Sequence, residues 1–242
     1  MNNRASNHPI DDATTPVPTG NGLAKSVART TPKTIRWLVL GAIAGPVLFT
    51  LAWAILGELS PGYTAWGTRI EPYSPISQPI SGLGLGPTAP FMNAAFVLSG
   101  LLLLVGVVNI FQSIREMGAF ARGICTLLLA LSPLGMIADG FFTLESILPH
   151  MVGFLLGCMT PVLSFVVSGL FLRRVKSFRR FGTWLLLGSP LTLALTVLYF
   201  LTFSPTIAGI QTGVAGLTER ILVVEVFAWF VAMGALAFHR LS

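Results

Sequence analysis

The chain has 242 residues, of which 53% are hydrophobic and only 10% are charged, and its mean hydropathy is +0.78. Soluble domains carry about 25% charged residues, so this composition excludes an ordinary soluble protein and predicts a single membrane domain. The formal net charge is +6, but the basic residues border apolar runs. That placement favours membrane topology and attraction to anionic headgroups, so no nucleic acid is expected as a partner.

Residues 1–34 are polar and rich in Asn, Thr and Pro, without apolar periodicity. We expect them to form a disordered cytoplasmic tail. Ala52-Trp53-Ala54 resembles the small-residue site of a cleaved signal sequence. The apolar run is too long for a signal peptide and the polar leader is unusual, so an uncleaved anchor is the favoured interpretation.

Six apolar runs follow, each near or above the roughly 20 residues that a helix needs to cross a bilayer. They predict an all-α polytopic membrane bundle over residues 35–242, with six transmembrane helices at about 35–57, 91–114, 120–142, 148–172, 183–203 and 220–239. The longest connection, residues 58–90, is rich in Pro and Gly and cannot form a regular helix. We expect it to be an ordered cap over the outer face, either as a structural lid or as part of a ligand site.

The basic residues predict the orientation of the bundle. Thirteen of the fifteen Lys and Arg lie in the tail, the second and fourth connections or the C-terminal end, and only Arg69 and Arg220 fall on the other side. The positive-inside rule therefore predicts a multi-pass protein of the cell membrane (plasma or inner) with both termini cytoplasmic. Six acidic residues gather on the outer side, which topology does not explain because acids contribute little to it. They are Glu58, Glu71, Asp139, Glu145, Glu219 and Glu225.

Two acids lie within predicted spans. Asp139 is near the outer end of the third span and Glu225 lies inside the sixth. Ionisable residues in spans seldom face lipid and favour a functional role. We expect their partners to be His150, Arg220 and Arg69, either in a salt-bridged set that ties helix ends together or in a proton-handling or ligand-binding site.

The fourth span carries small and polar residues on one helical face: His150, Gly153, Gly157, Thr160, Ser164 and Ser168. This spacing predicts either a polar wall along a cavity headed by His150 or close helix packing through Gly153 and Gly157. Packing is the favoured reading because small residues concentrate at helix interfaces in any bundle.

Thr218-Glu219-Arg220 is expected to open the sixth helix, with Thr218 as the cap and Glu219 complementing the helix dipole. Arg220 opposes that dipole and lies on the side that is poor in basic residues. It is therefore expected to have an acidic partner or an anionic ligand.

Known catalytic and metal-binding patterns do not occur in the chain. There is no Gly-x-Ser-x-Gly, Walker or His-Glu-x-x-His motif. Of the three histidines, His8 lies in the tail, and His150 and His239 are expected on opposite faces of the membrane, so these two cannot share a metal. Cys125 and Cys158 are expected at different depths and as packing residues. We therefore expect no metal and no cofactor.

Several short motifs resemble the membrane-protein family catalogued as domain of unknown function 998. They are Ile80-Ser81-x-Leu83-Gly84 with Gly86-Pro87 and Asn93, then Asp139-Gly140-x-Phe142 with His150, and Gly216-x-x-Glu219-Arg220. The resemblance covers about residues 37–240 and implies a multi-pass membrane protein without transferring any activity. Family members often carry an acidic residue where this chain has Gly82, so a role for that acid does not transfer.

These features favour a bundle with an outward-facing polar site that binds or transports a small ligand or a lipid headgroup. The candidate ligand-binding residues are Asp139, His150, Glu219, Arg220, Glu225, Arg69, Ser81 and Asn93. One alternative is a membrane-embedded enzyme with His150 and Asp139 as acid–base groups acting on a lipid-linked substrate. Another is an accessory structural subunit. The expected partners are the lipid bilayer and a lipid or small molecule on the outer face, and the sequence does not indicate an oligomeric state.

Overall fold

The computed structural model of the protein describes residues 32–203 and 213–241. The helices are α1 (Pro32–Leu38), α2 (Gly41–Leu59), α3 (Ala89–Ser113), α4 (Ala119–Phe141), α5 (Ile147–Phe154), α6 (Thr160–Leu172), α7 (Arg179–Thr202) and α8 (Ala215–Arg240). Two short strands, β1 (Tyr63–Ala65) and β2 (Thr68–Ile70), and three short helical segments, η1 (Ile80–Gly84), η2 (Gly86–Thr88) and η3 (Leu155–Met159), complete the elements. The predicted tail, residues 1–34, falls almost wholly outside the described residues.

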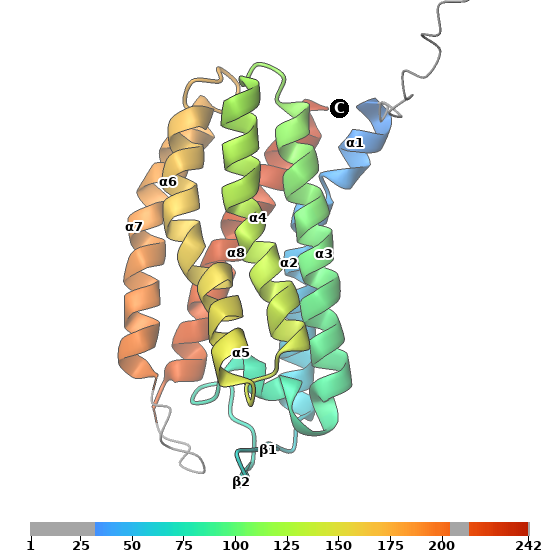
Figure 1. The fold of residues 1–242 in the computed structure, drawn as a ribbon, viewed down its shortest axis with the longest axis vertical. Coiled ribbons are helices and arrows are strands. Elements are labelled where there is room, and N and C mark those ends of the chain that lie inside the picture. The colour runs from blue at the N-terminus through green and yellow to red at the C-terminus, as the bar shows by residue number, and fades with distance from the viewer. Residues whose placement is uncertain (1–31, 204–212, 242) are drawn as a thin grey trace, which may run out of the picture. The chain divides into compact units, whose positions relative to one another are not determined.

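Within the described ranges, six helical stretches are long and apolar enough to cross a membrane: Thr34–Leu59, Gly86–Ser113, Ala119–Phe141, Ile147–Leu172, Arg179–Thr202 and Ala215–Arg240. This confirms the prediction of six apolar helices and suggests an integral, multi-pass membrane protein. Successive helices pack side by side from α2 through α7, and α8 closes the ring by packing on α7, α2 and α3 (Figure 1).

The β1–β2 hairpin marks one end of the bundle, which we call the hairpin end. The long loop between α2 and α3 (residues 60–88) lies there, as do α5 and the start of α8, whereas α1 and the C-terminal end of α8 lie at the opposite end (Figure 1).

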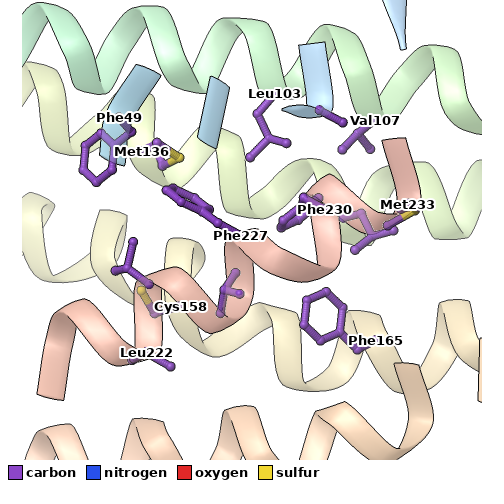
Figure 2. Close-up of a cluster of buried hydrophobic side chains, with 14 of the residues drawn as sticks. Phe49, Leu103, Val107, Met136, Cys158, Phe165, Leu222, Phe227, Phe230 and Met233 are labelled. Atoms are coloured by element: carbon purple, nitrogen blue, oxygen red, sulfur yellow. The ribbon is translucent and has the colours of Figure 1, made fainter. Parts of the chain in front are cut away.

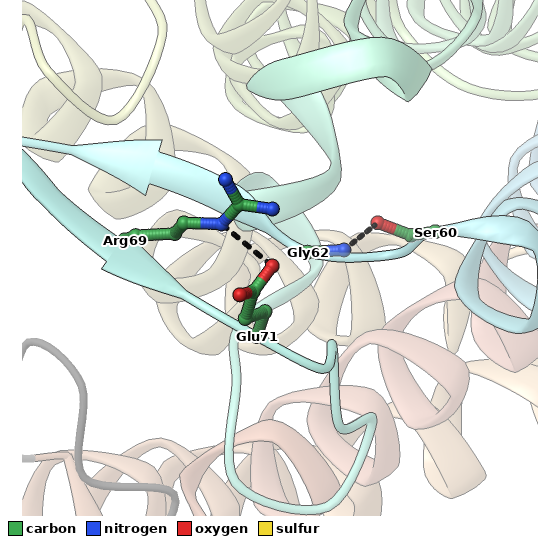
Figure 3. Close-up of polar contacts among 4 residues, drawn as sticks. All are labelled: Ser60, Gly62, Arg69 and Glu71. Atoms are coloured by element: carbon green, nitrogen blue, oxygen red, sulfur yellow. Dashed lines mark hydrogen bonds and ion pairs between the residues drawn. The ribbon is translucent and has the colours of Figure 1, made fainter.

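The hairpin is an addition to the all-α expectation. Its strands pair antiparallel, with Thr64 opposite Arg69. They are joined by Trp66 and Gly67, which both have positive φ (48° and 77°), the conformation of the tight turns that suit twisted hairpins. Arg69 Nε pairs with Glu71 Oε2 at 2.6 Å on the exposed side of this hairpin (Figure 3).

Helix α8 begins at Ala215, earlier than the predicted start near residue 220. The expected Thr218 cap is wrong: its Oγ1 donates to the Ala215 carbonyl at 3.0 Å and lies 2.7 Å from the Thr202 hydroxyl. The helix extends because the long loop supplies a partner for its first turn, where Leu217 N donates to the Ile76 carbonyl at 2.9 Å. Arg220 therefore lies in the second turn.

The fourth span is interrupted by the π-helical segment η3 between α5 and α6. Pro161 follows it and has no N–H for the carbonyl four residues earlier, which belongs to Gly157. Ser132 Oγ of α4 donates to that freed carbonyl at 2.8 Å. A neighbouring helix thus satisfies the backbone group that the proline leaves open, as membrane helices require.

Apolar side chains fill the middle of the bundle (Figure 2). Phe49 of α2, Met136 of α4, Cys158 of η3 and Phe227 of α8 approach one another from four elements (Figure 2). Phe230 continues this layer toward the opposite end. The polar residues described next lie between this core and the hairpin end.

Candidate functional site

The first two turns of α8 hold the long loop against the bundle. Gly216 lies directly under it, since a Cβ at this position would be 2.2 Å from the Gln78 carbonyl oxygen. Arg220 Nη1 donates to the carbonyls of Pro75 at 2.8 Å and Gln78 at 3.0 Å, and Nη2 donates to the Tyr73 hydroxyl. The contacts of Arg220 tie the loop to α8.

The partners of Arg220 differ from the sequence expectation. Among the described residues no carboxylate pairs with this guanidinium, and backbone carbonyls take its place. Its guanidinium carbon also lies 5.2 Å from the centre of the Trp53 ring. Arg220 is 6% exposed, and its Nη1 and Nη2 are bonded to the loop and to α8, whereas its buried Nε has no partner among the described residues. Its role in this geometry is structural.

Glu219, the residue before Arg220, binds the next part of the same loop. Its Oε2 accepts a hydrogen bond from Ile80 N at 2.7 Å, which fixes the start of η1. Both Glu219 and the next loop residue, Ser81, are buried. The loop thereby brings Ser81 and Glu219 to the same place inside the bundle.

Asp139 of α4 and His150 of α5 lie together, as the sequence analysis expected for this pair. Asp139 Oδ1 is 3.3 Å from His150 Nδ1. The same nitrogen lies 2.8 Å from the Phe142 carbonyl at the end of α4. A carbonyl only accepts, so Nδ1 carries a proton directed at Phe142 and Nε2 holds the lone pair of the neutral ring.

The carboxylate of Asp139 is 7% exposed, and no hydrogen bond reaches it from any described residue. Gly153 makes room for it, because a Cβ there would lie 2.1 Å from Oδ1. Burying a carboxylate without a hydrogen bond is costly, so this group calls for a proton or a partner. Asp139 Oδ1 is therefore a buried acceptor without a partner, as are the Gln78 side-chain amide and Arg220 Nε among the described residues.

These polar residues surround one hollow, the central cavity, at the hairpin end of the core. Its polar lining is Ser81, Ser132, Asp139, His150 and Glu219. Its apolar lining includes Phe49, Phe96, Met136, Phe154 and Phe227. The space open to the centres of water molecules is ≈ 40 Å³, and one water needs about 10–15 Å³ of such space. The cavity thus holds roughly three water-sized groups.

A second hollow, the side cavity, adjoins the first. The two share Ser81, His150, Phe154 and Glu219. The side cavity continues between α5 and α7, where its lining adds Met151, Tyr199, Phe200 and Phe203. Phe200 is 38% exposed on the surface of the bundle. The shared residues therefore lie between the core and the flank formed by α5 and α7.

The remaining candidates lie elsewhere. Glu225 accepts hydrogen bonds from Thr192 Oγ1 at 2.9 Å and from Trp229 Nε1, between α7 and α8. The side chain of Arg69 is 75% exposed on the hairpin. Asn93 Nδ2 donates to the Gly84 carbonyl at 3.2 Å and so supports η1 from α3.

The polar face of the fourth span serves both for close helix packing and as part of a cavity wall, the two interpretations that the sequence allowed. Gly153 packs against α4, with its backbone oxygen 2.4 Å from a Cβ built on Gly135. Gly157 instead lines the central cavity, and a Cβ there would meet nothing within 4 Å. The span therefore contacts α4 through one glycine and opens to the cavity at the other.

Two tyrosines of the long loop are buried around this assembly. Tyr63 packs over Gly82, where a Cβ would lie 2.7 Å from its ring, and Tyr73 contacts Arg220. Burial raises the pKa of Tyr63 well above its ordinary value, and burial raises the pKa of Tyr73 to about 12, although Arg220 lowers it in part. Both phenols remain neutral at physiological pH.

Some lining residues were not sequence candidates. Ser132 lies two helical turns before Asp139 and so on the same face of α4, whereas Phe154 and Tyr199 carry no signal that separates them from ordinary core aromatics. Their rings lie 5.0 Å apart and form the wall between α5 and α7. Only the tertiary arrangement assigns them to the site.

A protein-family model matches most of the chain. The model of a protein family described as "Protein of unknown function (DUF998)" matches residues 43–236. Searches of curated proteins and of solved structures gave no match. The three motifs behind the sequence resemblance meet around the two cavities, represented by Ser81, by Asp139 with His150, and by Glu219.

Proposed function

The chain belongs to the DUF998 family, and from that premise we propose that it is a membrane-embedded binding protein whose site is the central cavity. The observation that carries the proposal is the convergence of Ser81, Asp139, His150 and Glu219, from four separate elements, on one hollow. Asp139 lacks a hydrogen-bond partner among the described residues there. Structural polar clusters satisfy their buried groups internally, whereas a binding site leaves one for the ligand.

The size of the cavity limits the group that enters it. Space for roughly three water-sized groups admits the end of a headgroup or a small polar molecule but not a sugar. The larger remainder of a ligand would occupy the side cavity between α5 and α7. This flank consists of apolar helix surface, which supports entry from the membrane and a lipid or membrane-dissolved molecule as the ligand.

We place the hairpin end of the bundle outside the cell membrane and both termini in the cytoplasm. Support comes from the charges: in the described residues the hairpin end carries only Arg69 and Arg220 as basic residues, and the opposite end carries the remainder. Single cysteines introduced at Thr68 and Lys176 test this. An impermeant thiol reagent applied to intact cells should label the first and spare the second, and the reverse pattern would overturn the orientation.

The binding proposal is tested by native mass spectrometry of the protein purified in a mild detergent. The wild type should retain a small molecule or lipid, and Asp139→Asn should lose it while keeping its thermal stability, because the amide is isosteric and uncharged. Glu225→Gln is the matched control, since this half-buried carboxylate is satisfied by Thr192 and Trp229 outside the cavities. Equal retention by both variants would contradict the proposal.

Two Gly→Leu variants test whether the ligand occupies the central cavity without changing the charge of the site. Gly157→Leu places a side chain in the central cavity, where a Cβ is free of contacts, and should expel the ligand. Gly123→Leu is the control, because a Cβ there also meets nothing within 4 Å and Gly123 does not line either cavity. If Gly157→Leu retains the ligand as well as Gly123→Leu does, the ligand lies elsewhere.

A second candidate function is acid–base catalysis on a lipid-linked substrate. It is favoured by the hydrogen bond between His150 Nδ1 and the Phe142 carbonyl, which leaves Nε2 of the neutral ring as a base in the lining that His150 and Ser81 share. Lipid extracts from vesicles containing the wild type or His150→Gln test it. A product formed only by the wild type supports catalysis, and identical lipid profiles contradict it.

A further inference from the structure

The polar lining of the central cavity is rich in hydrogen-bond acceptors. Asp139 and Glu219 are carboxylic, Ser81 and Ser132 are hydroxylic, and His150 presents the lone pair of Nε2. Neither Lys nor Arg is among the lining residues. A site of this composition suits a ligand group that donates hydrogen bonds and carries positive charge.

The nearest guanidinium is already committed to the loop. Arg220 follows Glu219 in the sequence, but its Nη1 donates to the carbonyls of Pro75, Gln78 and Gly216 and it does not line the cavity. Glu219 receives its one hydrogen bond from Ile80 N, a neutral donor. Among the described residues, no Lys or Arg side chain forms an ion pair with either carboxyl group of the cavity. Of the lining residues, His150 is the one remaining side chain that could supply a positive charge to them.

His150 does not fulfil that role in the observed geometry. Its Nδ1 proton is directed at Phe142 at 2.8 Å, and Asp139 Oδ1 lies farther from the same nitrogen at 3.3 Å without forming a hydrogen bond. Asp139 is 7% exposed and therefore 93% buried. An external donor would complete this carboxylate and relieve the cost of its burial.

The apolar wall also favours a cation. The ring of Phe49 lies 4.6 Å from that of Phe96 and 5.7 Å from that of Phe227, and all three line the cavity. Aromatic faces attract cations through their quadrupole, most strongly where water is excluded. Carboxylates and aromatic rings together form the chemistry that proteins use to hold ammonium groups.

From this acceptor lining we propose that the ligand group is a primary ammonium, held between Asp139 and Glu219, on a lipid that reaches the site between α5 and α7. The inference rests on the proposed binding function and names its ligand class. Size favours the primary amine: a methylene with its ammonium fills about two water-sized volumes, whereas a methylene with a trimethylammonium needs about five. The ≈ 40 Å³ of the cavity has room for about three to four such groups.

The test uses the full chain in nanodiscs that contain equal amounts of phosphatidylethanolamine, phosphatidylcholine and phosphatidylglycerol, analysed by native mass spectrometry after the scaffold is removed. The wild type should retain phosphatidylethanolamine over each competitor by about tenfold or more, the range expected for charge-assisted hydrogen bonds. Asp139→Asn should abolish the preference, and Glu225→Gln should keep it.

The remaining outcomes separate the inference from the function on which it rests. Retention of phosphatidylglycerol or phosphatidylcholine that depends on Asp139 would overturn the ammonium assignment while leaving a binding site. Absence of any retention that depends on Asp139 would overturn both. A parallel titration with soluble ethanolamine shows whether the ammonium group belongs to a lipid or to a free amine. Displacement of the bound lipid by millimolar ethanolamine supports a free amine as the ligand. Retention of the lipid in the presence of ethanolamine supports a lipid as the ligand.

Discussion

Removal of the Arg220 guanidinium should release the long loop from α8. In Arg220→Met, the carbonyls of Pro75 and Gln78 lose donors at 2.8 and 3.0 Å. A buried polar group left unsatisfied costs about 1–3 kcal/mol, so the two together cost about 2–6 kcal/mol. The Gly216 carbonyl lies within the helix, and the Tyr73 hydroxyl still donates to Pro79 at 3.2 Å, so neither adds a full penalty.

The assay is amide hydrogen exchange of the protein in nanodiscs, read at the loop. If the free energy of local opening falls by about 2 kcal/mol, amide exchange accelerates by about 30-fold. The amides of Gln78, bonded to Ser74, and Ile80, bonded to Glu219, should show that acceleration or more. Amides in the middle of α3 and α4 should not change, because the loop opens without unfolding the bundle.

Arg69→Met is the matched control on the same face of the protein. The side chains of Arg69 and Glu71 are 75% and 49% exposed, and such surface ion pairs contribute about 0–1 kcal/mol. Exchange at the loop should change by less than about fivefold. If Arg220→Met also stays within that range, the assignment of Arg220 to the loop is refuted.

Three further changes test other contacts. Gly153→Ala drives a Cβ against the Asp139 carboxylate and should lower stability by about 1–3 kcal/mol, and an unchanged unfolding temperature would contradict the close packing. Ser132→Ala leaves the freed carbonyl of the π-helical segment unsatisfied and should lower stability by about 1–3 kcal/mol. Ser99→Ala is the control and should cost nothing, because the Ser99 hydroxyl has no partner among the described residues. Equal losses of stability would refute the role of Ser132 in satisfying this carbonyl. For Tyr73, the folded pKa of about 12 exceeds the unfolded value of 10.0, so its stabilisation is complete below pH 10 and about 3 kcal/mol is lost as pH rises to 12. Wild type and Tyr73→Phe should diverge over that window, and parallel unfolding curves would contradict the shift.

The membrane architecture was predictable because its determinants are local. A run of about 20 apolar residues must form a helix across a bilayer, so each span could be located without knowledge of its neighbours. The Asp139–His150 pair was predictable for a related reason: the third and fourth spans are joined by a short connection, which brings their ends together.

The partners of Arg220 and Glu225 could not be derived in the same way. Backbone carbonyls carry no sequence signature, so an arginine held by Pro75 and Gln78 looks the same in sequence as one that awaits an anion. Glu225 contacts Thr192 because of how α7 and α8 are rotated about their axes, which hydropathy does not encode. The hairpin had a usable signal, since Trp66-Gly67 lies between short runs that contain Thr and aromatic or branched residues.

The two cavities could not be predicted from the sequence, because they form only where the packed helices leave space. Pro161 in the fourth span was visible in the sequence, but the π-helical segment before it and the open space at Gly157 were not. Four elements had to be placed before Ser81, Asp139, His150 and Glu219 could be recognised as one lining. The sequence singled out the four polar residues that the structure brings together, but it did not separate them from Arg220 and Asn93, which bind the long loop and η1.

A density map of the protein in nanodiscs rich in phosphatidylethanolamine tests the central claim most directly. The account predicts headgroup density in the central cavity within hydrogen-bond distance of Asp139 and Glu219, continuing through the side cavity to acyl density between α5 and α7. A central cavity that contains only water or is empty, with α5 and α7 closed over lipid that stays outside, would contradict it.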